Sequence, residues 1–105
     1  MFTKTICGKE VRVTEEGFFV DPGAWTEEMA EILAKEAGIE ELTDRHRHVI
    51  NFMRRDYYER GEIPTIRRIK NFSGVSVKEI YELFPDGPAK KAAYISGLGK
   101  PDGCL

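Results

Sequence analysis

Hydrophobic residues recur at helical spacing through most of the chain beyond residue 25. They follow the three- and four-residue steps that place side chains on one face of an α-helix. The pattern predicts a helix that begins at Thr26 and ends at Gly38, and a longer helix from Thr43 to Gly61. Three shorter helices are predicted over residues 66–74, 76–84 and 88–97. The chain is therefore expected to be mainly helical.

The first twenty residues have a different pattern. They are rich in β-branched and aromatic side chains, and turn-forming residues interrupt them at Cys7-Gly8-Lys9 and at Glu15-Glu16-Gly17. This composition is typical of short strands joined by turns. We expect a small N-terminal β-hairpin ahead of the helices.

Together these elements predict a mostly α fold of the α+β class, a small orthogonal helical bundle. Ile66 to Phe84, with Gly74 at the turn, has the spacing of a helix-turn-helix. A chain of 105 residues, 41% of them hydrophobic, supports one modest core. We assign residues 1–96 to a single helical domain and residues 97–105 to a flexible C-terminal arm.

The arm is predicted from a change in composition at Gly97. Glycine or proline occupies every second position from there to Gly103. Such a segment buries too little surface to offset its ordering entropy. Cys104, the penultimate residue, has almost nothing to pack against and is expected to be exposed. Extended from Gly97, the arm would carry this sulfur about 26 Å, far enough to enter another protein's cleft.

Charge excludes some classes of partner. The 16 Lys and Arg against 18 Asp and Glu give a net charge of -2, so the chain is not a polycation for nucleic acid or anionic membranes. Residues 10–44 hold 11 acidic and 2 basic side chains (net -9), whereas residues 45–70 hold 8 basic and 3 acidic (net +5). These are either solvated helix faces or a docking face. The candidate docking residues are Arg54, Arg55, Arg67, Arg68 and Lys70.

No apolar run approaches the roughly 20 residues of a membrane span, and the start lacks the apolar stretch of a signal peptide. A cytoplasmic location is expected. Cys7 and Cys104 are then thiols, with Cys7 a packed or half-exposed hairpin residue. His46 and His48 are two apart on a helix and point about 200° from each other, so no metal site is expected. No cofactor is expected either.

The chemistry of Cys104 favours a carrier over a catalyst. The thiolate is the attacking species, and an unperturbed cysteine titrates near ~8.5. Asp102 opposes ionisation, Lys100 favours it, and no histidine is near in sequence. A partner is therefore expected to supply the activating charge while Cys104 attacks a donor persulfide. Neither a base nor an oxyanion donor is evident, so a stand-alone enzyme is not favoured.

Two blocks of sequence resemble the DsrC/TusE family, which comprises the gamma-type protein of dissimilatory sulfite reductase and its sulfur-relay relative. The blocks are residues 83–90 (LFPDGPAK) and 97–105 (GLGKPDGCL). Further similar positions are Trp25, Gly38-Ile39, His46, Phe52, Arg54, Tyr57-Tyr58, Pro64 and Ile66-Arg67. The resemblance implies a small helical protein with a helix-turn-helix, whose mobile arm presents a sulfur-carrying penultimate cysteine to partner proteins.

Departures from the family pattern refine this expectation. Members that act with dissimilatory sulfite reductase have a second arm cysteine where this chain has Ala93. The resemblance therefore implies the single-cysteine branch, similar to the sulfur-relay protein of tRNA 2-thiouridine synthesis or to regulatory members. Gly99 stands where proline is usual, and Arg47 where tryptophan is usual.

We predict a sulfur carrier in which Cys104 holds persulfide sulfur, while Gly97, Lys100, Pro101 and Gly103 position the arm. The expected partners are proteins: a sulfurtransferase or relay complex, or a siroheme sulfite reductase. One alternative is a gamma-type accessory or regulatory subunit of dissimilatory sulfite reductase.

A second alternative is a DNA-binding regulator. The second helix of the predicted helix-turn-helix offers Lys78 against Glu79 and Glu82. Base and phosphate readers need basic or amide side chains there, so direct nucleic-acid binding is disfavoured.

Overall fold

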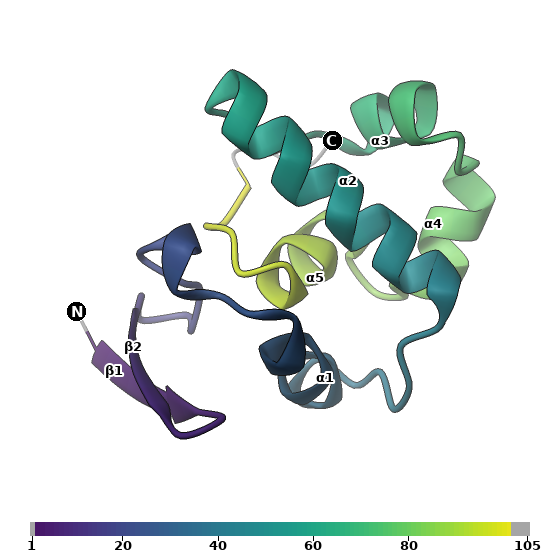
Figure 1. Ribbon diagram of the computed structural model, residues 1–105. Helices are drawn as coiled ribbons and strands as arrows, with labels where there is room; N and C mark the ends of the chain where they lie inside the picture. The colour runs from purple at the N-terminus through teal and green to yellow at the C-terminus, as the bar shows by residue number, and fades with distance from the viewer. Residues whose placement is uncertain (1, 102–105) are drawn as a thin grey trace.

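The computed structural model describes residues 2–101, and over this range it contains a two-stranded sheet and five α-helices (Figure 1). In chain order the elements are β1 (Phe2–Ile6), β2 (Lys9–Val13), the 3-10 turn η1 (Pro22–Ala24), α1 (Glu27–Glu36), α2 (Asp44–Arg60), α3 (Ile66–Ser73), α4 (Val77–Leu83) and α5 (Pro88–Ile95). The predicted mostly α fold with an N-terminal hairpin is confirmed. No helix within this range is long and apolar enough to cross a membrane.

The hairpin forms because its turn residues suit a tight turn and because buried and exposed side chains alternate along β2. β1 and β2 are antiparallel, with Phe2 opposite Val13 and Ile6 opposite Lys9. The two turn residues, Cys7 and Gly8, both have positive φ (51° and 76°), as a two-residue hairpin turn requires. Cys7 is exposed at this turn rather than packed. The apolar residues 18–20, which follow the second predicted turn, join the hairpin through one isolated bridge, between Val13 and Phe19.

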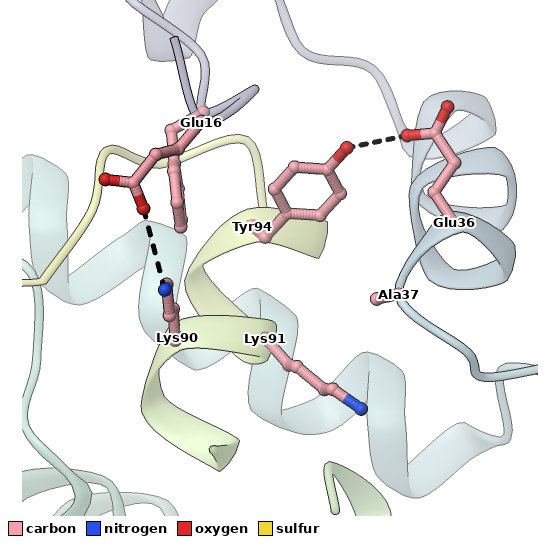
Figure 2. Close-up of a pocket in the computed structure, with 7 residues that line it drawn as sticks. Glu16, Glu36, Ala37, Lys90, Lys91 and Tyr94 are labelled. Carbon is pink, nitrogen blue, oxygen red and sulfur yellow. Dashed lines mark hydrogen bonds and ion pairs between the residues drawn. The ribbon is translucent and has the colours of Figure 1, made fainter. Parts of the chain in front are cut away.

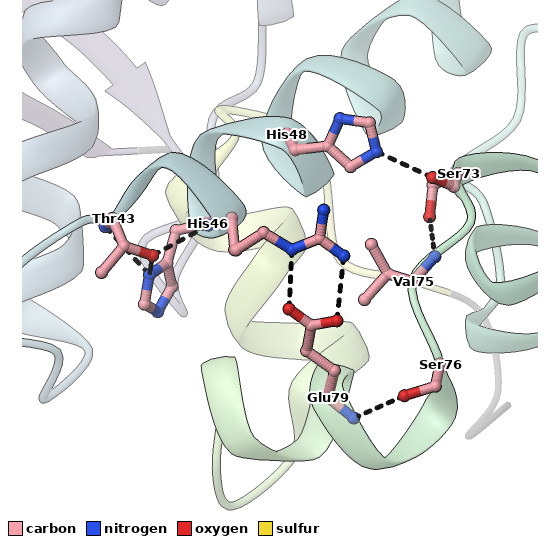
Figure 3. Close-up of polar contacts among 8 residues, drawn as sticks. Thr43, His46, His48, Ser73, Val75, Ser76 and Glu79 are labelled. Atoms are coloured by element: carbon pink, nitrogen blue, oxygen red, sulfur yellow. Dashed lines mark hydrogen bonds and ion pairs between the residues drawn. The ribbon is translucent and has the colours of Figure 1, made fainter.

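Side-chain caps mark the start of α2, α3 and α4. The Thr43 hydroxyl accepts from the His46 amide at 3.3 Å, and His46 Nδ1 accepts in return from the Thr43 amide at 3.1 Å (Figure 3). This is a capping box with histidine in the place of the usual Glu or Gln. The hydroxyls of Thr65 and Ser76 cap α3 and α4 by accepting from the amides of Arg68 and Glu79, without the return bond. These local signals explain why the sequence predicted the helix starts.

α5 is the central helix of the bundle, in contact with α1, α2 and α4 (Figure 1). Its fully buried Ala92 and Ala93 leave room for the neighbouring helices to approach. Larger fully buried side chains fill the surrounding core: Met29, Leu33, Val49, Ile50, Met53, Ile69, Ile80 and Phe84. The end of α5, from which the predicted arm departs, is therefore held on several sides.

The packed domain extends beyond the boundary predicted at residue 96. Gly97, at φ 71°, ends α5, and the Leu98 amide donates to the Ala93 carbonyl at 3.0 Å. This is a Schellman-type ending, in which the residue after the glycine packs back on the helix. Leu98 is fully buried, so Gly97 and Leu98 belong to the core rather than to a flexible arm. From Leu98 the extended reach to Cys104 falls to about 20 Å.

Candidate functional site

We call residues 96–101, the segment that follows α5, the arm root. Two side chains from elsewhere in the chain hold it. The Trp25 indole Nε1 donates to the Ile95 carbonyl at 2.9 Å. The Arg54 guanidinium donates to the Ser96 carbonyl at 2.8 Å and to the Pro22 carbonyl at 3.1 Å. The carbonyls that a helix leaves open at its C-terminus are thereby satisfied, and the arm root is fixed to α2 and to the η1 segment.

Arg54 and Trp25 also contact each other. The guanidinium carbon lies 4.2 Å from the indole centroid, a cation-π stack. Burial lowers the pKa of Arg54, and the Tyr58 hydroxyl at 3.4 Å opposes that shift. A Cβ built on Gly97 would lie 2.3 Å from Trp25 Cδ1, so no side chain fits there. A larger residue at Gly97 would therefore displace either Trp25 or the backbone.

Lys100 is held by a carboxylate from the loop after β2. Its Nζ donates to Glu16 Oε1 at 2.8 Å, and Lys90 lies 3.5 Å from the other oxygen of Glu16. The hydrogen bond from Lys100 lowers the pKa of Glu16 below its ordinary value of 4.5. The pair is exposed and contributes little to stability. It joins the loop after β2 to the segment that leads to Pro101.

A polar network beside this pair braces the hairpin against the helices. A cavity of about 330 Å³ is lined by Glu16, Lys90, Glu36 and Tyr94, among others (Figure 2). The Tyr94 hydroxyl donates to Glu36 Oε1 at 2.7 Å and accepts from Lys4 Nζ at 3.1 Å. Lys4 also pairs directly with Glu36. Burial raises the pKa of Tyr94, and its bond to Glu36 adds to that effect. The network joins β1, α1 and α5, and we assign it a structural role.

The five basic residues predicted as a docking face lie in separate places. Arg54 belongs to the arm root. Arg55 and Arg68 line one small cavity together with Phe72. Arg67 and Lys70 line another, on α3. The structure therefore divides the predicted cluster into three groups.

Arg68 has a structural partner that the sequence did not indicate. Asp56 is 3% exposed, and both of its oxygens accept from Arg68 Nε at 2.9 Å. Arg60 donates to the same carboxylate at 3.1 Å. Burial raises the pKa of Asp56, but the hydrogen bonds from Arg68 and Arg60 outweigh it, so the pKa is lowered. The contact with Arg68 holds α3 against α2, whereas the contact with Arg60 lies within α2.

Both histidines are used within the fold. His46 Nε2 lies 2.8 Å from the Leu83 carbonyl and joins α2 to the end of α4. His48 Nε2 lies 2.7 Å from the Ser73 carbonyl (Figure 3). Over residues 2–101, no three His, Cys, Asp or Glu side chains gather as metal ligands do. Neither histidine lies in the arm root.

Cys104 and Gly103, the remaining predicted site residues, lie outside the described part of the chain. Of the residues that hold the arm root, the sequence did not indicate the roles of Glu16 and Trp25. Trp25 carries a usable signal, because it is the one tryptophan of the chain. Glu16 carries none, since it stands in a generally acidic stretch.

Known proteins resemble this chain over nearly its whole length. Residues 5–105 match the family described as DsrC like protein. The gamma subunit of dissimilatory-type sulfite reductase from Nitratidesulfovibrio vulgaris is 37% identical over 101 residues, 96% of each chain. The sulfurtransferase TusE of Pectobacterium atrosepticum is 36% identical, covering 93% of this chain and 95% of its own. A crystal structure of dissimilatory sulfite reductase I (DsrI) is 33% identical with a TM-score of 0.88, and covers 99% of this chain and 100% of its own.

Proposed function

This chain belongs to the DsrC-like family, and from that membership we propose that it is a sulfur carrier of the relay type, with Cys104 as the residue that holds the sulfur. The single observation that carries the proposal is the position of this cysteine. It lies six positions after Leu98, whose side chain is buried in the core. The glycines between them leave the backbone free to enter a narrow channel without Cβ clashes.

The proposed reaction is a transfer of sulfane sulfur. The Cys104 thiolate attacks the terminal sulfur of a donor persulfide, R–S–SH. The S–S bond of the donor breaks, its R–S⁻ thiolate leaves, and Cys104 becomes the persulfide Cys–S–SH. Delivery repeats the step with an acceptor nucleophile, and Cys104 leaves as the thiolate. No external oxidant or reductant is needed.

The side chains around the arm root support a carrier that depends on its partners. In the described part of the chain, Arg54 and Trp25 are occupied with α5 carbonyls, Lys100 with Glu16, and both histidines with helix contacts. Each of these side chains is engaged within the fold, so we assign none of them to the activation of Cys104. A protein partner, either a sulfurtransferase or a relay complex of the tRNA 2-thiouridine type, would supply the charge that activates Cys104.

A second candidate is an accessory or regulatory subunit of a dissimilatory sulfite reductase that binds without carrying sulfur. The identity to the Nitratidesulfovibrio vulgaris gamma subunit favours it. Ala93 weighs against it, because the members that act with this reductase have a second cysteine at that position.

Intact-mass spectrometry separates the two candidates. The full chain carrying Cys7→Ser, which removes the exposed competing thiol, is incubated with a low-molecular-weight persulfide. A carrier gains about 32 Da per sulfur, and loses this gain when Cys104→Ser is added. An unmodified Cys104 under conditions that persulfidate a free cysteine peptide would reject the carrier and leave the accessory subunit.

A further inference from the structure

A groove beside the arm root has no role in the proposed reaction. Two adjoining cavities of about 390 and 240 Å³ form it, and Ile66 and Tyr81 line both. It runs between α3, α4 and the start of α5, and Pro101 stands at its edge. We call it the α3–α5 groove.

The floor of the α3–α5 groove is apolar and open to solvent. Tyr81 is 46% exposed and Val77 is 38% exposed, although both are large hydrophobic side chains. Ile66 and Pro88 continue the same surface between them. Adjacent apolar side chains that remain uncovered indicate a surface that another molecule covers.

The rim of the groove is positively charged. Its charged lining residues are Arg67, Lys70, Lys90 and Lys100, and no acidic residue of the described chain lines it. Lys90 and Lys100 share Glu16. Within residues 2–101, Arg67 and Lys70 have no ion-pair partner, in contrast to the paired arginines of the same basic region, such as Arg45 with Glu79.

We propose that the α3–α5 groove docks an acidic, amphipathic segment of the protein that exchanges sulfur with Cys104. Apolar side chains of that segment cover Tyr81 and Val77, while its carboxylates pair with Arg67 and Lys70. The proposal rests on the proposed function and names the chemistry of the partner.

The position of the groove explains why docking there serves the transfer. Pro101 lines the groove, and Cys104 follows three residues later, a distance of at most about 10 Å along the chain. A partner held in the groove therefore meets the thiol at high effective concentration. Nucleic acid is the weaker fit, because its affinity grows with the number of phosphate contacts and two unpaired cations offer few.

Binding is tested by NMR titration of the full, ¹⁵N-labelled chain. The probe is a synthetic peptide with leucines at helical spacing and glutamates between them, and its counterpart has lysine in place of each glutamate. We expect the acidic peptide to shift the amides of α3, of α4 and of the first turn of α5, and to bind less tightly as salt is added. R67E/K70E should weaken it at least about tenfold at low salt, and Y81A should weaken it as well.

The matched control is K9E/K78E, a reversal of two exposed lysines that do not line the groove. It should bind as the parent does, and circular dichroism verifies that each variant is folded. Shifts confined to other surfaces, equal binding of the lysine peptide, or unchanged binding by R67E/K70E would overturn the proposal. Binding of transfer RNA that exceeds that of the acidic peptide and is lost in R67E/K70E would assign the groove to nucleic acid instead.

The docking proposal and the carrier proposal can fail independently. Reaction of Cys104 with a small persulfide does not involve the groove, so R67E/K70E should gain sulfur at the parent rate. If Cys104 gains no sulfur, the carrier proposal fails while peptide binding is still measured. If only peptide binding fails, the groove proposal is rejected and the carrier remains.

Discussion

Replacing Gly97 with alanine tests how firmly the arm root is held. The added Cβ would lie 2.3 Å from Cδ1, 2.5 Å from Cγ and 2.6 Å from Cβ of Trp25. The indole has little freedom to move away. Its Nε1 is bonded to the Ile95 carbonyl, and Arg54 stacks on its ring. The substitution must therefore displace either the indole or the chain that leads to Cys104.

Two terms set the expected loss of stability. Alanine at φ 71° introduces backbone strain of about 1 kcal/mol. Overpacking against the fixed indole adds about 1–3 kcal/mol. The free energy of unfolding should therefore fall by roughly 2–4 kcal/mol, which lowers the melting temperature of a domain of this size by about 10–20 °C.

Gly61→Ala isolates the backbone term. Gly61 has a φ of 76°, and a Cβ there meets no atom within 4 Å. Urea unfolding and thermal melts of both variants should show Gly97→Ala losing at least about 1 kcal/mol more than Gly61→Ala. Adding Trp25→Ala should abolish that excess. Equal losses in the two glycine variants would refute the claim that Trp25 and Gly97 fix the arm root.

Three further predictions concern the contacts that position the helices. Asp56→Asn should lower the free energy of unfolding at pH 7 by about 1–3 kcal/mol. Because the pKa of Asp56 is lowered in the fold, its stabilising contribution is present above the ordinary value of 3.8 and is lost as pH falls below that value. Urea titrations should therefore show the difference in stability between variant and parent closing at low pH. Arg54→Lys keeps the charge but loses the fork that reaches the Ser96 and Pro22 carbonyls, so it should lower stability by about 1–2 kcal/mol, whereas a matched Arg55→Lys should stay within about 0.5 kcal/mol. His46→Ala removes the capping partner of Thr43 and the link to Leu83, and hydrogen exchange should show faster opening of the end of α4 than in His48→Ala.

The helices were predictable because their signals are local. Thr43, Thr65 and Ser76 are N-caps, Gly61 and Gly74 end helices in the left-handed conformation, and the apolar residues between them repeat at helical spacing. Each signal lies within a few residues of the helix end it determines. The hairpin was predictable for the same reason, from its turn residues and the alternation of β2.

The arm root was not predictable, because its contacts join distant parts of the chain. Trp25 and Ile95 are 70 positions apart, Arg54 and Ser96 are 42 apart, and Lys100 and Glu16 are 84 apart. Composition alone placed residues 97 and 98 in the flexible arm. The glycines on either side of Leu98 are typical of unstructured segments, and composition does not show that Leu98 is buried in the core. The five predicted docking residues lie in three separate groups for a similar reason. A run of basic residues in the sequence does not show which helix face each side chain occupies.

The most direct test of the carrier proposal is the state of Cys104 in the cells that make the protein. Cells are lysed in the presence of an alkylating reagent that traps thiols and persulfides, and the peptide containing Cys104 is mapped by mass spectrometry beside the one containing Cys7. The account predicts an alkylated persulfide on Cys104, about 32 Da heavier than the alkylated thiol, and a plain alkylated thiol on Cys7. A Cys104 found only as the thiol, from cells actively transferring sulfur, would contradict it.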